Sequence, residues 1–246
     1  MLRGFILFPF FSLLTFQIAL AQGNLLDQGL KLFTGDTGAE QSGAKLSSEK
    51  VSSGLKEALR IGSGKVVDQI SQVGGYTADP AIHIPLPQNL QTVKTALQAI
   101  GQGAMADELE AKLNQGAEKA ALEAQSLFVE AISAMTMEDV QRIYEGEKDA
   151  ATRYFQQKMT PLLTEKFKPV VSESLVDVGA LKTYNAMISD YKTIPFVPDI
   201  TDDLTDYTVG KALEGLFYYL AKEEEQIRQN PAARTTELLQ EVFGQN

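Results

Sequence analysis

The sequence has no cysteine and only one histidine, His83, in 246 residues. Without cysteine there is no disulfide, no thiolate nucleophile, no cysteine-ligated zinc and no lipid-bearing cysteine of a bacterial lipoprotein. Any histidine-dependent catalysis would have to use His83, which lies in a proline-rich stretch with no nucleophile-elbow sequence nearby. We therefore expect His83 to be a surface or packed loop residue, with a ligand in a histidine–carboxylate metal site as the alternative.

An excess of basic residues is also lacking. The chain has 22 lysines and arginines against 32 acidic residues, for a formal charge of −10 at pH 7. The basic residues alternate with acids along the chain instead of forming a basic patch. Since nucleic acids and anionic membrane surfaces bind such patches, this composition argues against both as partners.

Only one long apolar stretch occurs, and it lies at the start, in MLRGFILFPFFSLLTFQIALAQ. Arg3, the apolar run and the Ala-Leu-Ala that follows are typical of a secretory signal peptide over residues 1–21. The alternative is an N-terminal membrane anchor, for which the run is short. We predict export to the periplasm, a flexible leader over residues 22–47 and a mature protein that is not integral to the membrane.

Alternating β-patterns of useful length and fixed-period repeats are absent too. Apolar residues instead recur every three or four positions from residue 48 onward, which predicts a single all-α, bundle-like domain over 48–246 with seven to nine helices. The main irregular segment should run from Tyr76 to Pro87, where three prolines forbid a helix.

The expected helical segments differ in clarity. The clearest is Leu204–Arg228, with a predicted core face of Leu213, Leu216, Phe217 and Leu220. Met105–Met135 reads as one long alanine-rich helix, and Glu147–Val178 as a helix kinked or restarted at its two prolines. Thr136 should cap a short helix that ends at Gly146.

Cofactor motifs are missing. RIGSGKV and GQGAMA resemble phosphate-binding loops, but each lies in a helical context without a preceding strand, so no cofactor is predicted. Four aspartates in PDITDDLTDY could attract a cation, but acids before a helix more simply cap it and match its dipole. We predict no metal site and assign no catalytic residue.

The C-terminal stretch EEEQIRQNPAARTTELLQEVFG reads as a corner between two helices. Glu224 and Arg228 are spaced as an i, i+4 surface pair worth a few tenths of a kcal/mol. Asn230 should cap the last helix, with Pro231 in its first turn. Arg234 is not explained by this corner, because a cation in a first turn opposes the helix dipole.

Several segments resemble a known family: DAATRYF, EKFKPVV, VGALKTYN and the stretch from DLTDYTVGKALEGLFYYL to the C-terminus. They are similar to the bacterial family catalogued as domain of unknown function 4197, and the likeness covers roughly residue 48 to the end. The resemblance implies an all-helical exported protein, periplasmic in Gram-negative bacteria. It implies no activity and supplies no catalytic residues.

Arg234 leads to a hypothesis about a site. A tertiary partner should hold its guanidinium, and acceptors are available in segments that carry the resemblance. The candidate residues of this polar cluster are Arg234, Tyr154, Tyr184, Asn185, Asp206 and Tyr207. The cluster would be either a buried structural lock or the floor of a ligand site, and the third possibility is a solvent-exposed arginine.

The sequence thus favours a non-catalytic binding or interaction module, with a small molecule or an envelope protein as its partner. A hydrolase-type enzyme using carboxylate, tyrosine and arginine side chains is the alternative. An enzyme should place two carboxylates of opposed environments in one concave pocket. A binding module should show an apolar groove or pocket without that pair.

Overall fold

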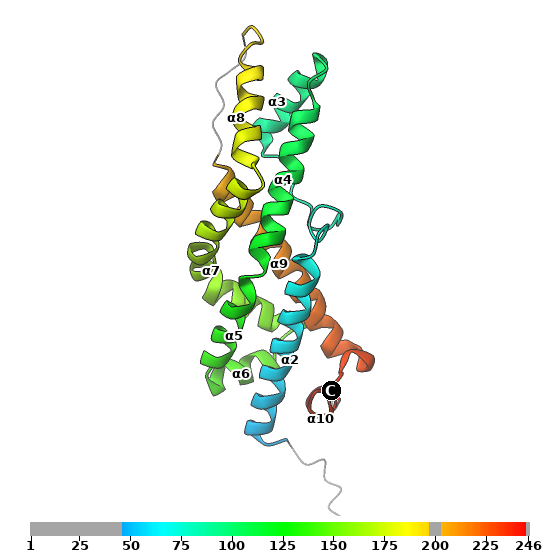
Figure 1. The fold of residues 1–246 in the computed structure, drawn as a ribbon. Coiled ribbons are helices and arrows are strands. Elements are labelled where there is room, and N and C mark those ends of the chain that lie inside the picture. The colour runs from blue at the N-terminus through cyan, green and yellow to red at the C-terminus, as the bar shows by residue number, and fades with distance from the viewer. Residues whose placement is uncertain (1–45, 197–202, 245–246) are drawn as a thin grey trace, which may run out of the picture. The chain divides into compact units, whose positions relative to one another are not determined.

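The computed structural model describes residues 46–196 and 203–244, which belong to a compact unit spanning Leu46–Asn246. This part of the chain contains nine α-helices and one 3-10 turn (Figure 1), with no strand: α2 (Ser48–Ile70), α3 (Gln88–Ala99), α4 (Ala104–Ala121), α5 (Ala124–Ala134), α6 (Met137–Tyr144), α7 (Ala150–Asp177), α8 (Ala180–Tyr191), α9 (Leu204–Gln229), η1 (Pro231–Ala233) and α10 (Glu237–Phe243). The all-α expectation is confirmed. The expected signal peptide and nearly all of the expected leader lie outside the described residues.

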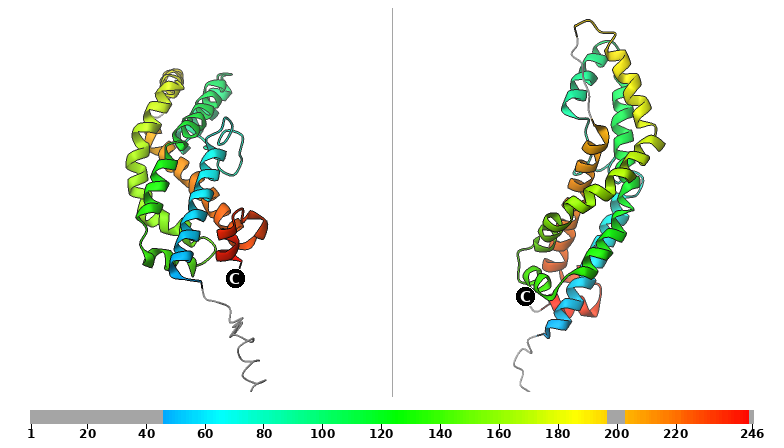
Figure 2. Two further views of the ribbon diagram at one scale, coloured as in Figure 1. Left: turned by 60° about the horizontal axis from the view of Figure 1, so that its bottom comes forward. Right: turned by 90° about the vertical axis from the view of Figure 1, so that its left-hand side faces the viewer.

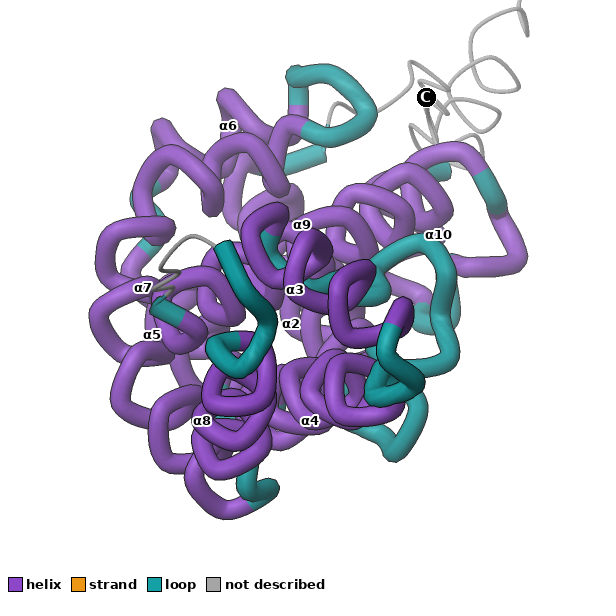
Figure 3. Tube along the Cα trace, turned by 90° about the horizontal axis from the view of Figure 1, so that it is seen from above, coloured by secondary structure: helices purple, strands orange, loops and turns teal. Residues whose placement is uncertain are grey.

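Helix α9 is the centre of the arrangement, because it packs along α7 and also contacts α2 and α4. In Figure 1, α3 and α8 flank α4 at one end of this helical unit, while α5, α6 and α10 surround the first half of α2 at the other. Figure 2 shows the same grouping from two further directions. Figure 3 shows the same unit from above, where helices make up most of the described chain and loops only connect them.

The core consists of the apolar stripes that the three- and four-residue spacing indicated. The predicted face of α9 is buried, with Leu213, Leu216, Phe217 and Leu220 each no more than 5% exposed. Phe128 of α5 meets Phe155 of α7 edge to face, with ring centroids 5.5 Å apart, and both side chains are fully buried. Such edge-to-face pairs add specificity to the burial of apolar area.

Three expected boundaries differ in the structure. The segment Met105–Met135 forms two helices, α4 and α5, which separate at Leu122–Glu123. No proline or glycine marks this break, so tertiary packing decides it: α4 packs on α7, α8 and α9, whereas α5 packs on α2. The segment Glu147–Val178 contains one helix, α7, which is not restarted at Pro161 or Pro169. The third difference, at the C-terminus, belongs to the site described below.

Two helix caps that were predicted from neighbouring residues are present in the structure. The Thr136 hydroxyl and the Asp139 carboxylate form a capping box at the start of α6. Asp203 caps α9, since its carboxylate accepts a hydrogen bond from the backbone N–H of Asp206 at 3.0 Å. This capping role was the one expected for the aspartate cluster. Its other members, Asp199 and Asp202, lie outside the described residues.

Other helix ends are closed by side chains from different helices. Lys56 of α2 donates to the carbonyl of Met135 after α5, at 3.0 Å. Lys112 of α4 donates to the carbonyl of Val178 after α7, at 2.6 Å. A cation at a helix C-terminus satisfies orphan carbonyls and complements the helix dipole. These long-range caps fix the mutual positions of the helices as well as their ends.

The irregular segment between α2 and α3 is held by one polar stripe of α4. Glu118 accepts from the backbone N–H groups of Tyr76 and Thr77, and Asn114 bonds both the N–H and the carbonyl of Ile84. One turn earlier, Glu110 lies 2.9 Å from the His83 imidazole. The single histidine is therefore a half-buried loop residue, as expected, and its second ring nitrogen faces the Thr77 carbonyl.

Asn114→Ala is expected to destabilise the protein by several kcal/mol. The substitution would leave the buried N–H and carbonyl of Ile84 without partners, at about 1–3 kcal/mol for each group. Urea unfolding followed by circular dichroism measures the loss. The control is Asn185→Ala, the same change at an exposed position of α8, which should have little effect. Equal effects at both sites would contradict the anchoring role of Asn114.

No helix in the described ranges combines the length and the apolarity that crossing a membrane requires.

Candidate functional site: an apolar groove between two long helices

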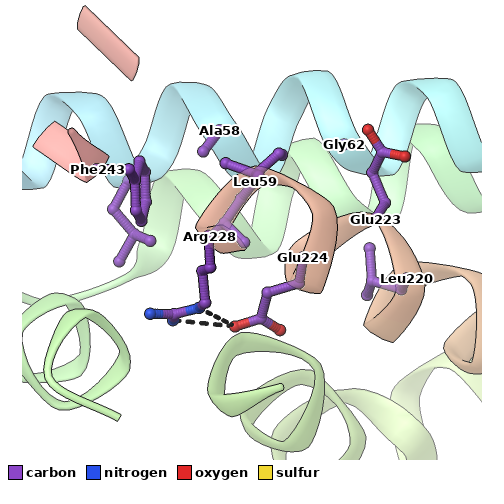
Figure 4. Close-up of a pocket in the computed structure, with 10 residues that line it drawn as sticks. Ala58, Leu59, Gly62, Leu220, Glu223, Glu224, Arg228 and Phe243 are labelled. Atoms are coloured by element: carbon purple, nitrogen blue, oxygen red, sulfur yellow. Dashed lines mark hydrogen bonds and ion pairs between the residues drawn. The ribbon is translucent and has the colours of Figure 1, made fainter. Parts of the chain in front are cut away.

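A narrow apolar groove lies between α2 and α9 and is covered at one end by α10. Ten residues line it, namely Leu55, Ala58, Leu59, Gly62, Leu220, Glu223, Glu224, Ile227, Arg228 and Phe243. Figure 4 shows Phe243 at one end and Leu220 with Glu223 at the other. The free volume is about 20 Å³, enough for about one water molecule, so a larger guest would require α10 or a wall to move.

Helix α10 sits on α2 through a glycine. A Cβ on Gly54 would lie only 2.5 Å from Cγ2 of Val242, so the bare backbone is what permits this close approach. Leu239, Val242 and Phe243 are the buried residues of α10. Outside this apolar contact, Lys50 of α2 forms an ion pair with Glu241 at 2.5 Å. The short helix is therefore held by one apolar face and one exposed ion pair.

Tyr144 of α6 and Arg228 of α9 also contact α10. Together with Gly54 and Lys50 of α2 they form the surface that we call the seat of α10. The Tyr144 hydroxyl, at the end of α6, donates to the Val242 carbonyl at 3.1 Å. The Tyr144 ring lies against Phe243, and the Arg228 guanidinium lies 6.0 Å from the centroid of the same ring. The Phe243 side chain is thus placed between an aromatic ring and a cation at the mouth of the groove.

Glu224 and Arg228 form the floor beside Phe243, and they are not the surface pair that their spacing suggested. Glu224 is 8% exposed and the Arg228 side chain 13% exposed. Besides Arg228, the Glu224 carboxylate accepts from the backbone N–H groups of Ala151 and Thr152 and from the Thr152 hydroxyl, each at 2.9 Å. It therefore caps the start of α7, for which Asp149 provides no side-chain cap.

The Arg228 guanidinium caps the C-terminal end of a helix, whereas Glu224 caps an N-terminal end. It donates to the carbonyl of Ile143 at 2.7 Å and to that of Tyr144 at 3.4 Å, at the end of α6. One buried ion pair thus supplies a negative charge to the start of α7 and a positive charge to the end of α6. Both placements match the helix dipoles.

Glu223 lines the other end of the groove and points toward α2. Its carboxylate bonds the ammonium of Lys65 at 2.6 and 2.8 Å. Both acids of the groove are therefore engaged, one by an exposed lysine and the other by a buried arginine and backbone N–H groups. What remains available in the groove is apolar surface.

Arg234 is buried, at 8% exposed, and closes the end of α9. Its guanidinium donates to the carbonyls of Ile227 and Arg228, at 3.0 and 2.8 Å. Its partners are thus backbone carbonyls, in place of the acidic or phenolic side chains that we expected. Because the dipole favours a cation at a helix C-terminus, this position resolves the conflict found in the sequence.

The position of Arg234 follows from a corrected boundary. Asn230 caps only the 3-10 turn η1, and the last helix begins at Glu237, where the Thr236 hydroxyl accepts from the N–H of Leu239. Arg234 thus lies in the connection between α9 and α10. Its own carbonyl accepts from the Gln240 side chain, so this residue also anchors the segment that carries α10.

The other predicted site residues do not gather around Arg234. Tyr154 lies on α7, half-buried against Phe155, and burial together with the Asp139 carboxylate raises the pKa of its hydroxyl. Tyr184 and Asn185 lie on α8, the first packed partly against the core and the second exposed.

Asp206 and Tyr207 lie at the start of α9, whereas Arg234 lies beyond its end. The helix has 26 residues, so these positions are separated by roughly 40 Å at 1.5 Å per residue. Asp206 pairs instead with Lys168 at 2.5 Å. The Tyr207 hydroxyl donates to the Pro85 carbonyl at 2.8 Å, and burial raises the pKa of this tyrosine. The structure therefore forms no single polar cluster from these candidates.

The groove itself was not predicted, although the sequence contains a signal for it. Gly54 and Gly62 are both buried on the inner side of α2. Their spacing of eight residues places both on the same side of the helix. A glycine pair at this spacing permits close approach of a second chain segment.

The described part of the chain brings together no set of metal-ligand side chains, and the groove is lined mainly by apolar residues. Across residues 46–196 and 203–244, no group of three histidine, aspartate or glutamate side chains lies together as metal ligands would. The groove offers aliphatic walls, one aromatic ring and acids that already have partners. The free surface of the groove is therefore apolar, and we assign no proton-transfer role to its acids.

A comparison with protein families identifies the chain. The model of the family described as protein of unknown function DUF4197 matches residues 45–244. The chain belongs to this family. The match contains every described helix, and the groove, α10 and the Arg234 connection all lie within it. No match was found among the curated proteins or among the solved structures.

Gly54→Ala and Gly62→Ala should change stability in opposite directions, although both replace a glycine inside α2. The Gly54 change would force Val242 and α10 away, whereas a Cβ on Gly62 meets its nearest neighbours at 3.4 and 3.6 Å. Alanine at Gly62 should therefore gain about 0.5–1 kcal/mol from helix propensity. Thermal unfolding gives the two signs, and limited proteolysis near residue 236 should be faster only in Gly54→Ala. Equal melting shifts would contradict the close seat of α10.

Proposed function

We propose that this DUF4197 protein is an exported, periplasmic interaction module without catalytic activity, and that the groove between α2 and α9 is its binding site. The observation that carries the proposal is the groove itself, an apolar channel between two long helices that α10 covers only in part. The export component rests on the sequence of residues 1–21, which has the pattern of a signal peptide.

The hydrogen bonds that already engage the two acids of the groove support a binding function over a catalytic one. A carboxyl group that acts as a general acid or base must be able to exchange a proton with the substrate. Glu224 instead accepts hydrogen bonds from two backbone N–H groups, a hydroxyl and Arg228, and Glu223 is bonded to Lys65. No specific observation at the groove favours the hydrolase alternative.

The walls of the groove support recognition of an apolar group. Leu55, Leu59, Leu220 and Ile227 are each no more than 6% exposed, yet they surround free volume. Filling such a space with an apolar side chain or chain segment removes further apolar area from water, at about 25 cal/mol per Å². The partner is thus expected to bind mainly through apolar contact.

The test uses the dye 1-anilinonaphthalene-8-sulfonate, whose fluorescence rises in apolar sites. Phe243→Ala opens the mouth of the groove and should increase dye binding relative to the wild type. Adding Ala58→Leu to that variant places a larger aliphatic side chain beside the opened space, because Ala58 lines the groove next to Phe243 (Figure 4), and should cancel the increase. Circular dichroism of each variant verifies that the helices remain folded.

The double variant decides the outcome. If Phe243→Ala takes up dye and the added Ala58→Leu does not reduce it, the dye binds elsewhere and the groove is not the site. The same conclusion follows if opening the mouth leaves dye binding unchanged. The exposed apolar residue Val176 on α7 provides a control, because Val176→Ala should leave dye binding at the wild-type level.

A further inference from the structure

Helix α10 has the properties of a bound peptide. Its buried residues Leu239, Val242 and Phe243 fall at positions i, i+3 and i+4, which is the spacing by which an amphipathic helix occupies a groove. With seven residues it is too short to be stable as an isolated helix in water. Its helical state therefore depends on the seat that α2, α6 and α9 provide.

The charges of this seat and of its occupant are opposite. Helix α10 carries Glu237 and Glu241 and no basic residue. Lys50 lies beside it on α2 and pairs with Glu241, and the Arg228 guanidinium lies over the Phe243 ring. A helix with a basic residue in place of Glu241 would set two cations side by side. The seat thus favours an acidic side chain at that position of its occupant.

The connection before α10 allows exchange without unfolding of the core. It is fixed at Arg234, whose side chain is bonded to the end of α9. Beyond it, α10 contacts α2 and α9 mainly through one apolar face. Release of α10 would expose the Gly54 surface and extend the groove that begins at Gly62.

Building on the proposed function, we propose that the partner of this groove is an acidic amphipathic helix of another protein, which takes the place of α10. The partner helix would present three apolar residues at positions i, i+3 and i+4 and an acid toward Lys50. In the free protein, α10 occupies the seat and acts as an internal competitor.

Internal competition has a measurable consequence. A segment tethered by a short linker acts at an effective concentration in the mM range. A free helix of similar affinity therefore binds the wild-type protein only weakly. Weakening α10 while leaving the seat intact should strengthen binding of a free helix, whereas damaging the seat should weaken it.

The experiment uses the full chain and a fluorescein-labelled peptide with the sequence of residues 235–244, followed by fluorescence anisotropy. The Phe243→Ala protein should bind this peptide at least about tenfold more tightly than the wild type, because only its internal competitor has lost an aromatic anchor. Adding Gly54→Ala to that protein should abolish the gain, since Val242 of the peptide could no longer approach α2. A peptide with Glu237→Lys and Glu241→Lys should bind several-fold more weakly.

Three results would overturn the proposal, and one of them separates it from the proposed function. Equal peptide affinity for the wild type and Phe243→Ala would rule out competition by α10. If Phe243→Ala takes up the dye but does not bind the peptide, the groove remains a binding site and the helical partner is wrong. A wild-type chain that forms dimers, lost in Gly54→Ala, would assign the seat to α10 of a second copy.

Discussion

Replacing Glu224 with alanine is expected to lower the free energy of unfolding by about 3–5 kcal/mol. The carboxylate is buried and serves two backbone N–H groups of α7, one hydroxyl and the Arg228 guanidinium. Its removal leaves the start of α7 uncapped and Arg228 without a counter-charge inside the protein. Guanidinium unfolding followed by circular dichroism measures this loss.

The neighbouring residue provides a matched control for Glu224. Glu225 pairs with Lys148 at 2.9 Å, but the lysine side chain is 59% exposed. Exposed pairs of this kind contribute little because water and salt screen them, so Glu225→Ala should change stability little. Similar losses for Glu224→Ala and Glu225→Ala would show that the buried bridge does not organise α6, α7 and α9.

The second large effect is expected at Phe155, where alanine should cost about 3–5 kcal/mol. The side chain is fully buried on α7 and packs edge to face on Phe128 of α5. Its truncation leaves a cavity between α5 and α7. The two helices cannot simply close this cavity, because α7 also packs along α9. Phe196→Ala, at a fully exposed phenylalanine, serves as the control and should be nearly neutral. A loss below about 1 kcal/mol at Phe155 would contradict the tight packing of α5 on α7.

Much of this fold could be predicted from the sequence because its information is local. The apolar stripe of α9 was recognised from its spacing, and Leu213, Leu216, Phe217 and Leu220 are buried. The Thr136 cap has a short-range signature as well. The break between α4 and α5 lacked one, since it arises from the different neighbours of the two helices. Helix ends that are determined by tertiary packing have no signature in the adjacent sequence.

The site was harder to predict because its polar groups act over long sequence distances. Glu224 and Arg228 have the spacing of a surface pair, and only the folded chain brings them to Ala151, Thr152 and Ile143. Arg234 was recognised as unusual, but its acceptors are backbone carbonyls, which no sequence pattern reveals. The glycines of α2 were a signal that could have been used, since Gly62 lines the groove and Gly54 lies under α10.

The central claim is that the groove between α2 and α9 binds a partner in the cell. Native mass spectrometry of the protein, purified gently from the cells that produce it, tests this most directly when the wild type is compared with Gly62→Leu. The account predicts an additional bound mass on the wild type that is lost from Gly62→Leu while the circular dichroism spectrum remains helical. A wild-type protein without bound mass, or a bound mass that persists in Gly62→Leu, would contradict it.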